Sequence, residues 1–131
     1  MRGKFLVFLM SVISVFAGCS DKTKFKSVDS KEFERQIAVE GTQLVDVRTA
    51  DEFATAHIVG AVNIDVTASD FDEKVSKLDK TKPIAVYCRS GNRSKRAAQR
   101  MADAGFVVVE LDGGILFFGN NDFSAFGLNS G

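Results

Sequence analysis

Short apolar runs alternate with segments of helical spacing along most of this chain. Five runs have strand composition, and they lie at residues 24–28, 44–47, 62–64, 83–87 and 107–111. Between them, hydrophobic residues recur three or four positions apart, as they do on the buried face of a helix. Apolar strands that alternate with helices are typical of a parallel sheet covered on both faces. We therefore predict an α/β fold with a central parallel sheet of about five strands.

Capping residues predict where the helices begin and end. Two segments have the spacing of a capping box, namely Asp29 with Glu32 and Thr49 with Glu52. The second of these predicts a short helix from Ala50 to about Ala56. Ser69 is expected to cap a later helix, and Gly41 to close the first one. The last predicted helix runs from Lys95 to Gly105, directly after a loop that follows the strand at 83–87.

Length and charge limit the classes of protein that the chain can belong to. Its 131 residues, of which 45% are hydrophobic, suffice for one domain with one core. Lys and Arg total 17, as do Asp and Glu, so nothing favours a nucleic-acid partner. A local basic cluster is better suited to a small anion or a docking partner; it comprises Arg89, Arg93, Lys95, Arg96 and Arg100.

The N-terminus has the pattern of a signal peptide at residues 1–18. Arg2 and Lys4 precede an apolar stretch at 5–16, which is shorter than the ~20 residues that span a bilayer. The segment Phe16-Ala17-Gly18-Cys19 resembles a bacterial lipobox, with Phe16 where Leu is usual. We expect an exported lipoprotein of the bacterial cell envelope, anchored through a lipid on Cys19 on the periplasmic or surface side. Residues 19–24 then form a polar tether, and 25–127 the folded domain.

Three alternatives for this segment stay open at the level of sequence. The signal peptide is cleaved and Cys19 is incidental, or the segment remains as an uncleaved anchor. In the third, Cys19 and Cys88 form a disulfide, because they are the two cysteines of an exported chain. That bridge would tie a flexible leader to a tight loop and would consume the candidate nucleophile described next.

The stretch from Tyr87 to Ser94 holds the candidate chemistry. It joins a predicted strand to a predicted helix, and free backbone N–H groups at a helix start converge on an anion in such a loop. Cys88 stands there with Arg89 and Arg93, so N–H dipoles and two guanidinium charges favour its thiolate. Cys88 is therefore a candidate nucleophile. In a parallel sheet, the strand ends at 46–48, 88–89 and 112–114 should share one rim with it.

Five pieces of the chain, in order, resemble the rhodanese-like sulfurtransferases across residues 25 to 120. They are Leu44-Val45-Asp46-Val47-Arg48, Glu52-Phe53, His57-Ile58 with Gly60 to Ile64, Val86 to Ser94, and Leu111 to Ile115. Ala56 and Val59 stand where the family usually has Gly and Pro, and Phe118 where it often has Trp. None of these departures touches the loop.

The resemblance implies a rhodanese fold and a two-step sulfur transfer without metal or cofactor. Cys88 would take a sulfane sulfur from a small anionic donor such as thiosulfate and pass it to cyanide, a thiol or a thioredoxin-like protein. Backbone N–H groups of the loop would stabilise the persulfide, with Gly91 allowing the turn. The implied loop residues are Arg89, Ser90, Gly91, Asn92, Arg93 and Ser94. We expect a monomer.

Several residues have a structural alternative to a functional role. Arg93 either contacts the donor or braces the loop, and Arg89 either contacts the donor or faces solvent. Asp46 and Arg48 are expected to support the loop, as an ion pair or by orienting it. His57, the only histidine, resembles a structural position of the family, and one histidine with two distant cysteines makes no metal site.

Two other functions stay open. One is a binding module that carries a persulfide without turning over small donors. The other is a cysteine-based phosphatase or arsenate reductase on a related scaffold, whose loop is longer by one residue. Four residues separate Cys88 from Arg93, and this shorter loop fits one sulfur atom better than a phosphate. The physiological donor and acceptor, and the role of residues 119–131, cannot be read from the sequence.

Overall fold

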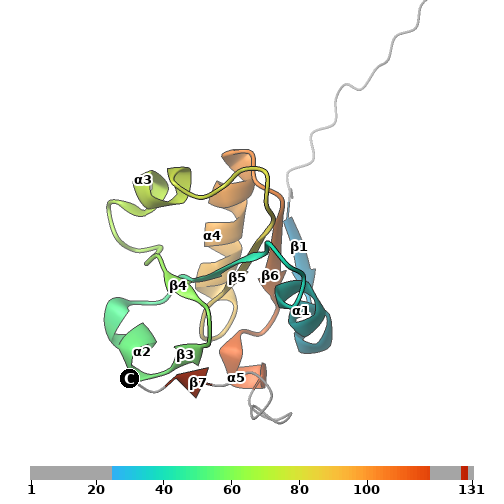
Figure 1. Ribbon diagram of the computed structural model, residues 1–131. Coiled ribbons are helices and arrows are strands. Elements are labelled where there is room, and N and C mark those ends of the chain that lie inside the picture. The colour runs from blue at the N-terminus through green and yellow to red at the C-terminus, as the bar shows by residue number, and fades with distance from the viewer. Residues whose placement is uncertain (1–24, 119–127, 130–131) are drawn as a thin grey trace, which may run out of the picture.

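Five strands form one sheet in the computed structural model, which describes residues 25–118 and 128–129. All four strand pairings are parallel, as predicted. The spatial order is β1 (Phe25–Val28), β6 (Val108–Leu111), β5 (Ile84–Tyr87), β2 (Gln43–Asp46) and β4 (Val62–Asn63) (Figure 1). Parallel strands place their C-terminal ends on one edge, so the rim expected from the sequence exists.

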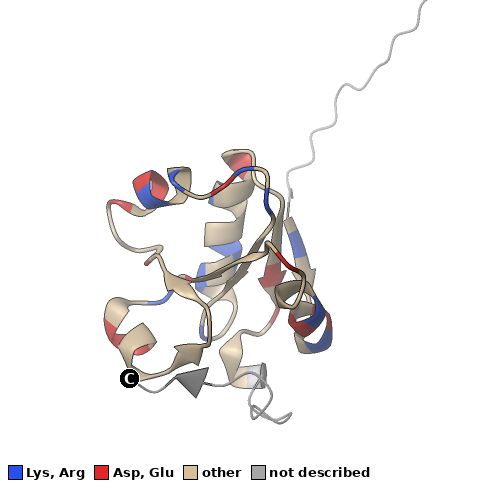
Figure 2. Ribbon diagram, in the orientation of Figure 1, with Lys and Arg blue, Asp and Glu red and all other residues tan. Residues whose placement is uncertain are grey.

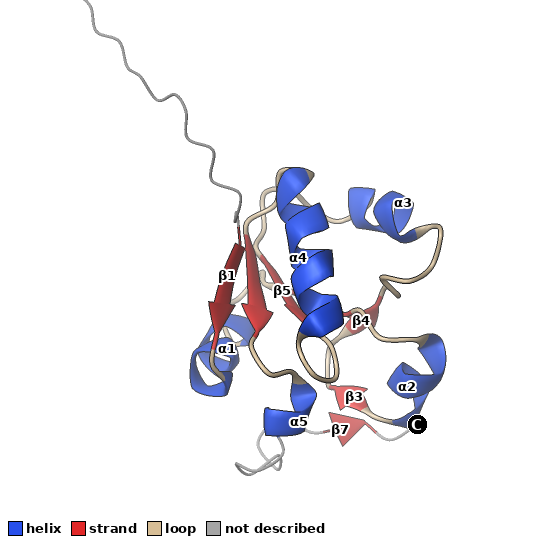
Figure 3. Cartoon of the chain, turned by 180° about the vertical axis from the view of Figure 1, so that it is seen from behind, coloured by secondary structure: helices blue, strands red, loops and turns tan. Residues whose placement is uncertain are grey.

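Helices cover both faces of this sheet, and each face buries its own hydrophobic cluster. α3 (Phe71–Ser76) and α4 (Asn92–Asp103) pack on one face, and α1 (Ser30–Ile37) on the other. Figure 3 shows α4 in front of the strands, whereas α1 lies in front in the opposite view of Figure 1. Side chains of a strand alternate between faces, so Val86 and Cys88 join the α4 cluster and Tyr87 joins the α1 cluster.

Short elements gather beyond the C-terminal ends of the strands. α2 (Ala50–Thr55) follows β2, and α5 (Ile115–Phe118) follows β6. β3 (His57–Ile58) pairs antiparallel with β7 (Leu128–Asn129) in a separate two-stranded sheet. In Figures 1 and 3 this pair lies beside α2 and α5, below the main sheet. The sequence did not predict it, because β7 lies far from β3 along the chain and has no apolar alternation.

The predicted capping residues have mixed outcomes. Thr49 and Glu52 form a complete capping box, and Asp29 accepts the backbone N–H of Glu32. The Ser69 prediction is wrong, because a turn from Ala68 carries the chain past it and α3 begins at Phe71. The Gly41 prediction is also wrong.

α1 ends at Ile37, before Gly41, because the backbone N–H of Val39 bonds the Gln36 carbonyl and tightens the last turn. The Thr42 hydroxyl donates to the Gln36 carbonyl at 2.9 Å, and the Val39 N–H donates to the same carbonyl at 3.1 Å. Gly41 instead takes φ +91° in the turn that leads to β2.

The predicted signal peptide, Cys19 and the tether at 19–24 lie outside the described residues, as do most of residues 119–131. Processing, lipid attachment and export therefore stay predictions. Within 25–118 and 128–129, no helix has the length and hydrophobicity needed to cross a membrane.

Candidate active site

Cys88 follows β5 directly and lies fully buried beneath the start of α4. Its thiol is free, and its sulfur accepts the backbone N–H of Gly91 at 3.0 Å. Gly91 has φ +102° and is the N-cap of α4, so the chain turns here in a conformation that side chains disfavour. α4 begins at Asn92, three residues earlier than predicted, which places Arg93 and Ser94 in its first turn. The sulfur therefore accepts the backbone N–H of Gly91, and convergence of the other loop N–H groups on an anion stays a prediction.

The start of α5 holds the loop from the outer side. Ile115 donates its N–H to the Cys88 carbonyl at 3.0 Å, and Leu116 donates to the Arg89 carbonyl at 3.1 Å. These two carbonyls point toward α5, and the Gly91 N–H points toward the sulfur. Arg89, Ser90 and Asn92 are exposed, whereas Gly91 and Ser94 are buried.

Arg93 joins α4 to α2 through Glu52. Its two terminal nitrogens bond the two Glu52 oxygens at 2.7 and 3.0 Å. These hydrogen bonds lower the pKa of Glu52 to about 2, although burial opposes the change, and they raise the pKa of Arg93. Arg93 thus braces the start of α4 against α2 through a carboxylate, and not through the loop carbonyls that the structural alternative expected. Its contact with a donor stays a prediction.

We expect Glu52→Gln to destabilise the protein by about 1 kcal/mol at neutral pH. Glutamine keeps the capping interaction with Thr49 but loses the charge that faces Arg93. Because the folded-state pKa of Glu52 lies below its ordinary value of 4.5, the pair stabilises the fold above pH 4.5. That contribution disappears as the pH falls toward 2.

The measurement is the free energy of unfolding of wild type and variant between pH 7 and pH 2. The difference should be largest at pH 7 and should shrink below pH 4.5. Glu73→Gln is the matched control, since Glu73 pairs with Lys77 on an exposed surface at 3.8 Å and should contribute less. A Glu52→Gln deficit that stays constant across this pH range would contradict the ion-pair account.

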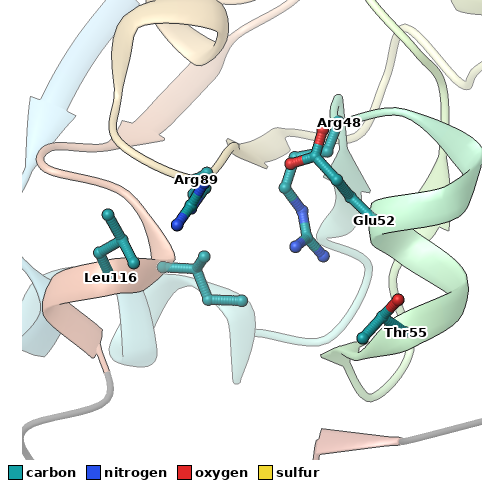
Figure 4. A pocket seen from close by; sticks show the side chains of 6 residues that line it. Arg48, Glu52, Thr55, Arg89 and Leu116 are labelled. Atoms are coloured by element: carbon teal, nitrogen blue, oxygen red, sulfur yellow. The ribbon is translucent and has the colours of Figure 1, made fainter.

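A pocket of about 310 Å³ lies beside the loop. Figure 4 shows Arg48 and Arg89 entering it from opposite sides, with Leu116 near Arg89, and Glu52 and Thr55 from α2 on the far side. Ile115 completes the lining. Two guanidinium groups and one carboxylate face this pocket, and Arg48 is paired with Asp46, so the attraction of an anionic ligand would depend mainly on Arg89.

Asp46 and Arg48 form the predicted ion pair, which is buried. Arg48 Nη2 lies 2.6 Å from Asp46 Oδ2 and also donates to the Ala56 carbonyl at 2.7 Å. The neighbouring Tyr87 hydroxyl accepts the Ile58 N–H at 3.0 Å, and burial, followed by Asp46, raises its pKa. Asp46 thus fixes one wall of the pocket by fixing Arg48.

Two further residues that the sequence singled out, His57 and Arg100, make structural contacts. His57 stacks on Phe53 with ring centroids 3.7 Å apart, and its Nδ1 lies 2.8 Å from the Phe53 carbonyl. Arg100 pairs with Asp72 at 2.7 Å and lies over the Phe71 ring. Figure 2 shows both signs of charge on α1 and α3. Within the basic cluster, Arg93, Lys95 and Arg100 are each paired with an acidic residue, so its positive charge is partly neutralised.

Sequence reasoning missed Glu110 as a residue of this site. It lies in β6, has no exposed surface, and its Oε2 is 2.6 Å from Ser94 Oγ, which in turn is 3.4 Å from Cys88 Sγ. The available signal was one carboxylate inside an otherwise apolar strand, since buried carboxylates need partners.

Comparison with known proteins gives consistent matches. Residues 29–120 match the rhodanese-like domain. The thiosulfate sulfurtransferase GlpE of Pseudomonas savastanoi is 36% identical over 94 residues, which cover 70% of this chain and 85% of the relative. The tRNA uridine(34) hydroxylase of Pelagibacter ubique is 34% identical over 104 residues, but these cover only 35% of that protein against 78% of this chain.

Solved structures agree with the fold. A rhodanese-related protein from Thermoplasma volcanium superposes with a TM-score of 0.69 at 25% identity, covering 82% of this chain and all of that one. A protein from Bacillus halodurans gives a TM-score of 0.67 at 28% identity, covering 83% of this chain and 79% of that one. With the buried cysteine after β5 and the parallel sheet around it, these matches show that the chain belongs to the rhodanese-like domain family.

Proposed function

We propose that this chain is a thiosulfate-type sulfurtransferase that carries sulfur as a persulfide on Cys88. One observation carries the proposal: a free thiol ends a central strand, and its sulfur accepts the Gly91 N–H at a helix start. The relatives named thiosulfate sulfurtransferase support a sulfurtransferase in general. Thiosulfate as donor is the finer step that this proposal adds.

The reaction proceeds in two displacements. The Cys88 thiolate attacks the sulfane sulfur of thiosulfate; a new S–S bond forms, the old S–S bond breaks, and sulfite leaves with the bonding electron pair. A nucleophilic acceptor then attacks the outer persulfide sulfur. With cyanide, thiocyanate forms and the Cys88 thiolate is regenerated. No net oxidation or reduction of the protein occurs over the cycle.

The chain's own residues supply electrostatic stabilisation at each step. The Gly91 N–H stabilises negative charge on the sulfur, and the α4 N-terminus adds its dipole. Arg89 is exposed at the adjacent pocket and offers its guanidinium to the anionic donor and the departing sulfite. Asp46, in contrast, balances the charge of Arg48, and Arg93 balances that of Glu52.

The test is the intact mass of the full chain after treatment with thiosulfate. We expect a gain of one sulfur atom, which is lost when cyanide is added, with thiocyanate released. An adduct that cyanide leaves in place, or no adduct at all, would contradict the proposal.

A persulfide carrier is the first alternative, and steady-state turnover with thiosulfate and cyanide distinguishes it from a sulfurtransferase. A carrier would acquire the sulfur from a protein donor and would show no turnover with thiosulfate and cyanide. Hydrolysis of an aryl phosphate through Cys88 would instead indicate the phosphatase class. Four residues between Cys88 and Arg93, and the engagement of Arg93 with Glu52, argue against that class.

A further inference from the structure

Glu110 is a buried carboxylate that the proposed sulfur transfer does not use. It has no exposed surface, and three donors surround it. Ser27 Oγ and Lys95 Nζ lie 2.6 and 3.0 Å from Oε1, and Ser94 Oγ lies 2.6 Å from Oε2. These three donors, one of them cationic, give the buried carboxylate the hydrogen-bond partners that burial requires.

Ser94 has one hydroxyl hydrogen and three neighbours that can accept it. Glu110 Oε2 is at 2.6 Å, the Gly91 carbonyl at 3.1 Å and Cys88 Sγ at 3.4 Å. The shortest contact is also the one to a charged acceptor, so the hydrogen belongs to Glu110. The Ser94 oxygen then presents a lone pair to Cys88. A lone pair can accept the S–H of a thiol, but it cannot donate to a thiolate.

We propose that Glu110 is a positioning residue that holds the Ser94 hydroxyl as an acceptor toward Cys88 and so keeps the resting sulfur protonated. A protonated thiol is a weaker nucleophile and a poorer target for oxidation than a thiolate. Glu110 thus lowers the reactivity of the resting sulfur. Its effect on sulfur transfer rests on the proposed function, but its effect on the thiol does not.

Other charged groups near this network are accounted for. Lys95 also bonds Asp112 at 2.8 Å; burial lowers its pKa, but the bonds to Asp112 and Glu110 outweigh burial and raise it. On the other side of the loop, Arg93 is engaged with Glu52. Lys95 and Asp112 lie at the solvent side of Glu110, whereas Ser94 is its link to the sulfur.

The experiment measures alkylation of Cys88 by iodoacetamide as a function of pH in the full chain, with the Cys88 peptide quantified by mass spectrometry. In Glu110→Gln, the glutamine amide can donate to Ser94 Oγ, which releases the hydroxyl hydrogen. When Cys88 ionises, the charged sulfur is a stronger acceptor for this hydrogen than the neutral Gly91 carbonyl at 3.1 Å. We expect the midpoint of the pH profile to move down by about one unit, a roughly tenfold gain in alkylation on the acid side. An unchanged midpoint, or one that moves up, would overturn the proposal.

Two further variants make the result specific. Asp112→Asn removes the other carboxylate that bonds Lys95 and leaves Ser94 alone, so the midpoint should stay within about 0.2 units of wild type. A shift as large as that of Glu110→Gln would show a general charge effect and refute the route through Ser94. Ser94→Ala removes the acceptor of the thiol and should also lower the midpoint; a rise would mean that Ser94 donates to the thiolate. Ser94→Ala keeps the proposal testable if Glu110→Gln does not fold.

These outcomes are separate from the proposed function, because alkylation needs no sulfur donor. A chain that gains no sulfur from thiosulfate but shows the shift retains the role of Glu110 and loses only the proposed reaction. If sulfur transfer occurs, Glu110→Gln should also accelerate the first half-reaction below the wild-type midpoint.

Discussion

Replacing Cys88 with serine should lower kcat/KM for sulfur transfer from thiosulfate to cyanide by at least about a thousandfold. A serine hydroxyl is scarcely ionised at neutral pH and forms no persulfide. The replacement changes little else, because serine occupies less volume than cysteine and the Gly91 N–H that now bonds the sulfur can bond its oxygen. The loss should therefore appear in the chemistry and leave the folded state intact. Thiocyanate production under steady-state conditions measures it, with a thermal melt to check folding.

Cys19→Ser is the matched control, since it changes the other cysteine of the chain and lies before the rhodanese-like region at 29–120. It should retain turnover and the one-sulfur adduct. Turnover that persists in Cys88→Ser, or that disappears equally in both variants, would show that Cys88 is not the nucleophile.

The parallel sheet and the position of the loop could be predicted because both depend on local sequence. Apolar strands such as 84–87 and 108–111 must be buried on two faces, which requires helices on each side. The strand ends then meet at one edge, as expected: Asp46 is the last residue of β2, and Cys88 and Asp112 follow β5 and β6. Gly91 also behaves as its place in the motif predicts, with a positive φ at the helix start.

The partners of the charged residues could not be predicted, because they depend on how distant elements pack. Arg93 and Glu52 are 41 residues apart, and their fork-like contact exists only because α2 lies against the start of α4. Ser94 was predicted as one of several loop residues that stabilise a persulfide. The structure shows its hydroxyl 2.6 Å from Glu110, a residue that the sequence presented only as part of an apolar strand. The local sequence pattern identified the loop, whereas contacts with distant elements determine which hydrogen bonds each side chain of the loop makes.

Gly114→Ala should destabilise the protein by about 3–5 kcal/mol. It should also slow the formation of the thiosulfate adduct at the Cys88 loop. Gly114 has φ +70°, and a Cβ built there lies 2.3 Å from the Arg89 carbonyl oxygen and 2.7 Å from the Ser90 nitrogen. These are backbone atoms, so no side chain can rotate out of the way. The α5 start would have to withdraw, and it would lose the bonds from Ile115 and Leu116 that hold the Cys88 and Arg89 carbonyls.

Gly60→Ala separates this clash from the cost of the backbone conformation alone. Gly60 has a similar φ of +90°, but nothing lies within 4 Å of a Cβ built there, so its cost should be about 1–2 kcal/mol. Urea denaturation of both variants gives the two free energies, and the thiosulfate adduct measured well below each denaturation midpoint reports on the loop. We expect Gly60→Ala to form the adduct at the wild-type rate and Gly114→Ala to form it more slowly while still folded. Equal destabilisation of the two variants, with equal adduct rates, would mean that α5 does not hold the cysteine loop in place.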